Sequence, residues 1–206
     1  MARRPYHHGS LTEALLSAGT EAARREGVSG IAVRELASEV GVSPSAVYRH
    51  FPSADHLLAM VSQGAREEAA RRMIAARDAV TARRGAANAA VARFRAIGSA
   101  YVQFALDEPN LFLTAFAECS AEPTGEDDPS AWTVLTGSVD ELVAAGVLPR
   151  SLAGDAPLIA WSSVHGLAHI LLEDPRFAPG GQRQAIDSVL DGMMRALGMS
   201  VSAARR

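Results

Sequence analysis

The sequence predicts an all-α fold of about nine helices, and three observations support this prediction. Apolar residues recur at the helical spacing i, i+3, i+4 and i+7 in several stretches. Runs of β-branched and aromatic residues with strand-like alternation do not occur. The 206 residues are 48% hydrophobic, which is enough to bury a sizeable core. We expect three helices in residues 1–53, a connecting helix in 54–84 and a larger helical domain in 85–206.

The first predicted helix runs from Ser10 to Glu26. Ser10 and Glu13 have the spacing of a capping box, in which the two side chains bond the first backbone N–H groups of a helix. Gly27 ends the helix, because glycine adopts the left-handed closing conformation without a Cβ clash. The face predicted to be buried consists of Leu11, Leu15, Ala18 and Ala22.

Two short helices joined by a tight turn are predicted in residues 33–51. The apolar stripe of the first consists of Val33, Leu36, Ala37 and Val40. Gly41 stops this helix, Ser43 offers an N-cap oxygen to the next, and Pro44 fits its first position. The second helix carries at its end Tyr48, Arg49 and His50. This pattern is a helix-turn-helix unit, whose second helix enters the major groove of DNA.

The remaining predicted helices are bounded by caps and helix breakers. Ser53 caps a helix that runs from about Ala54 into the seventies, and Gly85 separates it from the next. Pro109 starts a shorter helix, and residues 120–130 are predicted to form an exposed acidic loop. Three amphipathic stretches complete the fold, at residues 132–145, 155–173 and 182–197.

Three N-terminal motifs resemble the DNA-binding domain of TetR-family transcriptional regulators: YHHGSLTEALLSAG (6–19), VRELASEVGVSPSAVYRHF (33–51) and PSADHLLAMV (52–61). Trp161, His165 and Gly166 further resemble the pattern of a subgroup with a WHG-type C-terminal domain. The resemblance implies a DNA-binding domain in residues 1–53 and a ligand-binding and dimerisation domain in 85–206. It also implies that the last two helices pack against their copies in a homodimer.

The candidate DNA contacts follow from residue chemistry and from this resemblance. Arginine can bind a guanine edge or a phosphate, Tyr48 and His50 can donate to phosphate, and small side chains let a helix lie close in the groove. The predicted DNA-binding residues are Arg34, Ser43, Pro44, Ser45, Ala46, Tyr48, Arg49 and His50. Arg3, Arg4, His7 and His8 form either an arm along the DNA or a solvated tail.

Two positions depart from the family pattern and motivate an alternative. Ala32 stands where the family usually has a Ser or Thr cap, and Ala54 where it usually has a Lys that grips phosphate. The leading hypothesis is a homodimeric repressor that an unknown small-molecule effector releases from a palindromic operator in double-stranded DNA. The alternative is a protein-interaction module that keeps the fold but has lost specific DNA binding.

The candidate effector contacts are aromatic or polar residues of the C-terminal region, and core packing is the alternative for each of them. They are Phe94, Tyr101, Phe104, Phe116, Trp132, Trp161 and His165. His165 and His169 have the spacing of a metal-ligand pair, but a third ligand is missing, so we predict no metal site and no cofactor. Residues 96–149 hold nine acids and no arginine, which suits either a cationic effector or a solvated acidic loop.

Composition narrows the functional class. The net charge of −3 is unevenly spread, since residues 66–95 hold eight arginines against three acids, so it does not argue against DNA binding. No catalytic or nucleotide-binding motif of the common types occurs, and we predict no enzyme. A single cysteine, Cys119, and the absence of a signal peptide or an apolar run long enough to span a membrane predict a cytoplasmic protein.

Overall fold

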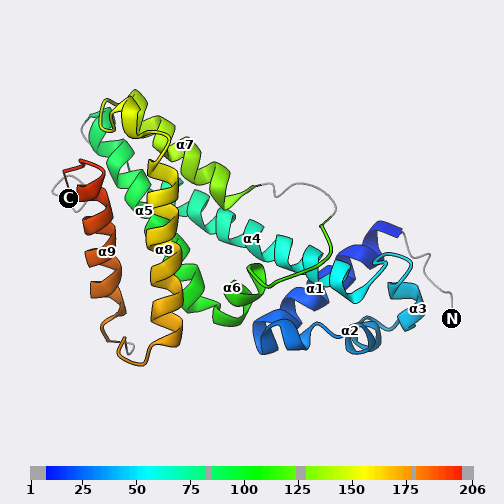
Figure 1. The fold of residues 1–206 in the computed structure, drawn as a ribbon. Helices are drawn as coiled ribbons and strands as arrows, with labels where there is room; N and C mark the ends of the chain where they lie inside the picture. The colour runs from blue at the N-terminus through cyan, green and yellow to red at the C-terminus, as the bar shows by residue number, and fades with distance from the viewer. Residues whose placement is uncertain (1–7, 82–84, 124–128, 178–179, 201–206) are drawn as a thin grey trace. The chain divides into compact units, whose positions relative to one another are not determined.

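The computed structural model describes residues 8–81, 85–123, 129–177 and 180–200, and the side chains from residue 11 onward within these ranges. The described residues form nine α-helices and two short 3-10 helices and no strand, which confirms the predicted all-α fold (Figure 1). The helices are α1 (His8–Glu26), η1 (Gly27–Gly30), α2 (Val33–Val40), α3 (Pro44–Val47), α4 (Ala54–Asp78), α5 (Ala86–Asp107), α6 (Pro109–Ala115), α7 (Ala131–Ala144), η2 (Arg150–Leu152), α8 (Ala156–Glu173) and α9 (Gln182–Ala196).

The chain divides into two compact units. The first unit comprises Met1–Arg66 and Glu108–Asp127, and the second comprises Glu67–Asp107 and Asp128–Arg206. These units are defined by internal contacts, whereas the domains predicted at 1–53, 54–84 and 85–206 are defined by role, so those boundaries stay a prediction. Among the described helices, none is long and apolar enough to cross a lipid bilayer.

The first unit is built around α1, which packs against α2 and α6. The predicted apolar face is confirmed for Leu15, Ala18 and Ala22, which are buried, while Leu11 is half-buried. Gly19 allows close packing, because a Cβ there would lie 2.8 Å from a methyl carbon of Val61. The core of this unit therefore depends on a small residue in the middle of α1 as well as on its apolar stripe.

The ends of α1 differ in how well the sequence predicted them. The helix begins at His8, two residues before its predicted start, so Ser10 lies inside it and the prediction of Ser10 as the N-cap is wrong; such differences are common at helix termini. The predicted end is confirmed, since the helix stops at Glu26 and Gly27 has a φ of +67°. The capping hydrogen bonds of Ser10 lie outside the described side chains.

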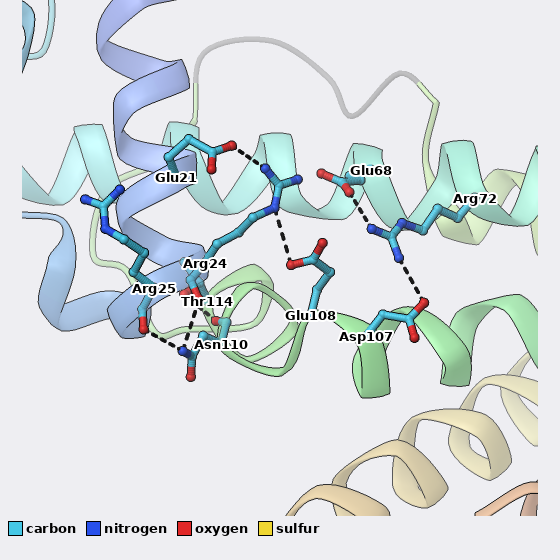
Figure 2. Close-up of polar contacts among 9 residues, drawn as sticks. All are labelled: Glu21, Arg24, Arg25, Glu68, Arg72, Asp107, Glu108, Asn110 and Thr114. Atoms are coloured by element: carbon cyan, nitrogen blue, oxygen red, sulfur yellow. Dashed lines mark hydrogen bonds and ion pairs between the residues drawn. The ribbon is translucent and has the colours of Figure 1, made fainter.

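A side chain from α6 satisfies the carbonyls at the C-terminal end of α1. The Asn110 amide donates to the carbonyl oxygens of Arg24 and Arg25 at 3.1 and 3.0 Å, as Figure 2 shows. The Arg24 guanidinium also pairs with Glu108 at 3.3 Å. These carbonyls have no partner within their own helix, so Asn110 acts as a C-cap supplied by another segment of the chain. The sequence pattern gave no sign of this contact.

The second unit is organised around α5, which packs against α7, α8 and α9. Figure 1 shows α8 and α9 side by side and antiparallel. The Arg95 guanidinium of α5 pairs with Asp187 at 2.5 Å and with Asp191, both on α9. Arg95 is only 12% exposed and Asp191 8% exposed, so the pair is largely desolvated and its carboxylates compensate the buried charge. Gly98 lets α5 approach α9, because a Cβ there would lie 2.9 Å from a methyl carbon of Leu190.

We predict that a serine at position 32 stabilises the protein. Ala32 has the extended backbone of an N-cap, and its carbonyl already accepts from the N–H groups of Glu35 and Leu36. Ala32→Ser should therefore raise the free energy of unfolding by about 0.5–1 kcal/mol, measured as a shift in the urea midpoint.

The matched control is Ser53→Ala, which removes an existing cap. The Ser53 hydroxyl accepts from the His56 N–H at 3.0 Å, so this variant should lose a similar amount of stability. If Ser53→Ala is destabilising but Ala32→Ser has no effect, the capping account of α2 is wrong.

Candidate functional site

The turn between α2 and α3 has the geometry that the sequence predicts. Gly41 closes α2 with a φ of +77°, a left-handed conformation that favours glycine. The Val42 N–H donates to the Ala37 carbonyl at 2.8 Å and so satisfies one of the last carbonyls of α2. The Ser43 hydroxyl accepts from the Ala46 N–H at 3.3 Å, and Pro44 occupies the first helical position. Both predicted caps are confirmed.

Helix α3 is shorter than the sequence pattern indicates. It ends at Val47, so Tyr48, Arg49 and His50 lie in the turn that follows it. The N–H groups of His50 and Phe51 both donate to the Val47 carbonyl at 2.9 Å, which keeps this turn compact. The prediction that these three side chains lie within the end of the helix is wrong, because the backbone tightens into a turn before Phe51 enters the core.

The candidate DNA-binding side chains are mostly exposed. Ala46 and His50 are half-buried, and Tyr48 is 50% exposed despite its large apolar ring. The exposed set is Arg34, Ser43, Pro44, Ser45, Tyr48 and Arg49. The exposed tyrosine and the two exposed arginines lie outside the core of the first unit. This arrangement suits contact with phosphates and base edges.

The His50 ring is held from α1. Its Nδ1 lies 2.9 Å from the hydroxyl of Thr12, a hydrogen bond between residues far apart in the sequence. This bond orients a side chain that the sequence predicts to contact phosphate. Thr12 is a site residue that the sequence analysis missed, and no local pattern marks it, because the pairing depends on how α1 packs.

The two departures from the family pattern have clear places in the structure. Ala32 precedes α2 and supplies no side-chain cap, and Ala54 is exposed at the start of α4. Neither alanine can donate a hydrogen bond through its side chain. The predicted N-terminal arm, Arg3, Arg4, His7 and His8, lies outside the described side chains.

Four of the candidate effector residues form a ring cluster in the second unit. The Trp161 ring lies 5.1 Å from Tyr101 and 6.1 Å from Trp132, measured between ring centroids. It also stacks on His165 at 5.7 Å with an interplanar angle of 13°. The Tyr101 hydroxyl lies 2.9 Å from His165 Nδ1, within hydrogen-bond distance. Trp161 and His165 belong to α8, Trp132 to α7 and Tyr101 to α5.

Both polar members of this cluster are held in their neutral forms. Burial raises the pKa of the Tyr101 phenol far above its ordinary value. Burial also lowers the pKa of His165, and the neighbouring His169 lowers it further. The Tyr101–His165 bond is therefore a bond between an uncharged phenol and an uncharged imidazole at neutral pH.

A small cavity of about 20 Å³ lies beside this cluster. It has room for about one water molecule, so it is nearly closed. It is lined by Met73, Phe94, Ile97, Gly98, Tyr101, Leu135, Ala160, Trp161, Val164 and Met193. Of the seven candidate effector residues, Phe94, Tyr101 and Trp161 line the cavity, and Trp132 and His165 contact Trp161.

The structure does not bring the other two candidates to this cavity. Phe104 is buried under the Arg72 guanidinium, whose carbon lies 5.0 Å from the ring centroid. The same guanidinium pairs with Glu68 and Asp107 (Figure 2). Phe116 belongs to the first unit, where its ring lies 5.3 Å from that of Phe112.

The sequence predicted Phe94, Tyr101 and Trp161 as candidate contacts but missed the other seven lining residues, because these are ordinary apolar residues or glycine: Met73, Ile97, Gly98, Leu135, Ala160, Val164 and Met193. Phe94, Ile97, Gly98 and Tyr101 share one face of α5 at helical spacing, which predicts a buried face. That spacing does not tell whether the buried face meets a neighbour directly or leaves a gap. No group of three or more potential metal ligands occurs in the part of the chain that the structure describes.

Two family models match the chain. Residues 15–61 match the model described as bacterial regulatory proteins of the tetR family. Residues 94–197 match the tetracyclin repressor-like C-terminal domain, which spans half of the chain. No curated protein is detectably similar in sequence.

Solved structures share the fold along nearly the whole chain. A protein with unknown function from Rhodococcus sp. RHA1 is 29% identical, with a TM-score of 0.72, covering 95% of this chain and 99% of the other. A TetR transcriptional regulator from Streptomyces coelicolor is 19% identical, with a TM-score of 0.57 and coverage of 94% and 98%.

A third structure, described as the molecular basis for control of antibiotic production by bacterial hormones, is 20% identical. Its TM-score is 0.62, and the match covers 93% of this chain and 99% of the other. The helix-turn-helix geometry of the first unit, the two family matches and the shared fold lead to one assignment. The chain belongs to the TetR family and is a DNA-binding transcriptional regulator.

Proposed function

We propose that this protein is a homodimeric repressor that a small-molecule effector releases from a palindromic operator. The observation that carries the proposal is the exposed helix-turn-helix surface, in which Tyr48 is 50% exposed and Arg34 and Arg49 are also exposed. A regulator of this kind acts where the bacterial chromosome lies, in the cytoplasm. Repression is the commoner mode of the family, and the operator experiment below tests it.

Each DNA-facing residue has a chemical role in this proposal. Arg34 and Arg49 bind a guanine edge or a phosphate, and Tyr48 donates from its hydroxyl to phosphate. His50, oriented by Thr12, contacts phosphate from its ring. The small residues at the start of α3 let this helix lie close to the bases; they are Ser43, Pro44, Ser45 and Ala46.

The dimer is proposed to form through α8 and α9. Helix α8 carries three exposed apolar side chains: Leu158 is 65% exposed, Ile159 37% and Ile170 47%. An exposed apolar face on a helix in a water-soluble regulator is stabilised by burial against a partner. A two-fold dimer buries the same face of each copy and presents two reading helices to half-sites about 34 Å apart, or a multiple of that spacing.

The effector is proposed to act through the ring cluster and cavity of the second unit. A ligand shifts a regulator only by the difference between its affinities for the DNA-binding state and the released state. One structure of the same fold is described in terms of control by bacterial hormones, which supports a small-molecule signal. The candidate contacts are the residues that line or contact the cavity: Phe94, Tyr101, Trp132, Trp161 and His165.

The proposal is tested by fluorescence anisotropy of the purified protein on duplexes that tile the DNA upstream of its own gene, at several salt concentrations. Tight binding to one near-palindromic duplex, weakening steeply with salt, is expected for a dimeric DNA reader. Uniformly weak binding to every duplex would instead favour the protein-interaction module, since the side chain of Ala54 cannot bind a DNA phosphate. A promoter fusion then tests the sign of regulation, because deletion of a repressor raises transcription.

We predict that Tyr48→Phe and Arg34→Ala weaken DNA binding in different ways. Loss of a hydroxyl that contacts phosphate weakens binding to all sequences by a similar factor. Loss of an arginine that reads a base costs about 1–3 kcal/mol and relaxes selectivity at one base pair. Anisotropy on single-substitution duplexes distinguishes the two. An equal loss on every duplex for Arg34→Ala would make Arg34 a phosphate contact.

We predict that Thr12→Val weakens DNA binding although Thr12 itself is only a positioning residue. Its hydroxyl bonds His50 Nδ1 at 2.9 Å, and losing one such bond costs about 0.5–1.5 kcal/mol, or a few-fold in affinity. Thr12→Ser keeps the hydroxyl and should restore affinity. If both variants unfold at the wild-type urea midpoint yet bind DNA like the wild type, the orienting role of Thr12 is disproved.

We predict that Leu158→Glu shifts the protein to monomers and reduces operator affinity. A carboxylate buried in the proposed apolar interface loses hydration without a partner, which costs several kcal/mol. Sedimentation velocity measures the oligomeric state. The matched control is Val28→Glu, because Val28 is 42% exposed on η1 of the first unit and its substitution should leave the dimer intact. An unchanged dimer in Leu158→Glu would exclude α8 from the interface.

A further inference from the structure

The cavity of the second unit is lined almost entirely by uncharged, apolar groups. Nine of the ten lining residues are apolar or glycine, and Tyr101 supplies the only hydroxyl among them. No carboxylate, arginine or histidine is among those ten residues. Burying an unpaired charge in such surroundings carries a large desolvation penalty. None of the acids of residues 96–149 is among these ten lining residues, so a cation that enters the cavity meets no carboxylate to offset its loss of hydration.

Apart from the indole N–H of Trp161, the polar chemistry at the cavity is one neutral hydrogen-bonded pair. Tyr101 is 1% exposed, and its hydroxyl lies 2.9 Å from His165 Nδ1. Burial raises the pKa of Tyr101 and lowers the pKa of His165, so neither group carries charge at neutral pH. A phenol oxygen that donates to an imidazole can still accept one hydrogen bond, and in the other tautomer its O–H can donate one.

Three of the lining residues beside this pair are aromatic: Phe94, Tyr101 and Trp161. The Trp161 ring is nearly parallel to the His165 ring, with an interplanar angle of 13°. Two small residues, Gly98 and Ala160, also line the cavity, and the side chain of Leu190 lies against Gly98. Aromatic faces of this kind favour flat aromatic partners in offset or edge-to-face contact.

The cavity must widen to hold a ligand, because its present volume of about 20 Å³ holds about one water molecule. Two of its walls can adapt. Met73 and Met193 are unbranched, flexible side chains. Trp132, which contacts Trp161 edge to face, is 43% exposed and so is only partly confined by packing. These are the side chains that we expect to move when an aromatic ring enters.

We propose that the second unit binds an uncharged, flat aromatic molecule that carries one hydrogen-bonding group, with its ring against Trp161 and its polar group on the Tyr101–His165 pair. The binding stands on the cavity alone, and only its role as the effector rests on the proposed function. The ligand class is thus a neutral phenol-like or indole-like aromatic rather than a cation, a carboxylate or a phosphate.

Tryptophan fluorescence reports directly on this site, because the two tryptophans of the chain, Trp132 and Trp161, both belong to the ring cluster. The probes are four molecules of nearly equal size: para-ethylphenol, ethylbenzene, para-ethylbenzoate and para-ethylbenzylammonium. Excitation at the red edge of tryptophan absorption avoids the probes themselves. We expect saturable quenching by para-ethylphenol with a Kd about tenfold below that of ethylbenzene, and weaker binding still of both ions.

Two variants test the residues. Tyr101→Phe should remove the tenfold preference for para-ethylphenol over ethylbenzene while leaving ethylbenzene binding unchanged. Ala160→Leu should fill the cavity and weaken both neutral probes at least tenfold. The matched control for the lost hydroxyl is Ser138→Ala: Ser138 is buried on α7, does not line the cavity, and its hydroxyl has no hydrogen-bond partner among the described residues. This control should bind all four probes like the wild type.

The outcomes separate this inference from the proposed function. Binding of either ion as tight as that of para-ethylphenol, or no response to any probe, would overturn the ligand class. Retention of the tenfold preference in Tyr101→Phe would overturn the role of Tyr101. If para-ethylphenol binds as expected but does not release the operator duplex in the anisotropy assay, the ligand class stands and ligand-released repression is the part that fails.

Discussion

The candidate DNA-binding surface depends on two buried side chains that anchor a helix too short to be stable alone. Helix α3 has only four residues, and a helix of one turn gains too few hydrogen bonds to offset the entropy of ordering its backbone. Val47 is fully buried and Phe51 is 2% exposed, and burial of each contributes about 1.5–3 kcal/mol. These two residues fix both ends of the segment that carries Tyr48 and Arg49. The exposed side chains of Tyr48 and Arg49 are therefore not needed for folding and remain available for the proposed DNA contact.

In the second unit, α5 likewise provides two kinds of residue: some pack in the core, and others are candidate effector contacts. Arg95 holds α5 to α9 through two carboxylates, and Gly98 lets the two helices approach. One helical turn away, Tyr101 makes the single neutral polar contact beside the cavity. The ion pairs of Arg95 lie outside the cavity and fix α5 against α9. The neutral Tyr101–His165 pair lies beside the cavity, where it is proposed to bind a ligand.

Local chemistry made the helix-turn-helix unit predictable and left its exact form open. The bounds of α2, the left-handed Gly41 and the cap from Ser43 follow from residue types that act within a few positions of the chain. The end of α3 does not follow, because the turn after Val47 is set by how Phe51 reaches the core. For the same reason Thr12 could not be assigned to the site, since its bond to His50 joins α1 to the turn after α3.

The aromatic candidates show the same limit. Seven residues were chosen by type, yet the fold groups five of them at one cavity, places Phe104 under Arg72 and places Phe116 in the other unit. The sequence by itself determined the approximate extents of the helices, the caps at Gly41, Ser43 and Ser53 and the helix-turn-helix motif, because each depends on backbone preferences and on apolar spacing within one segment. The tertiary structure alone decided which aromatic rings meet, which polar groups become neutral through burial, and where a cavity remains, because these depend on distances between helices that no local pattern encodes.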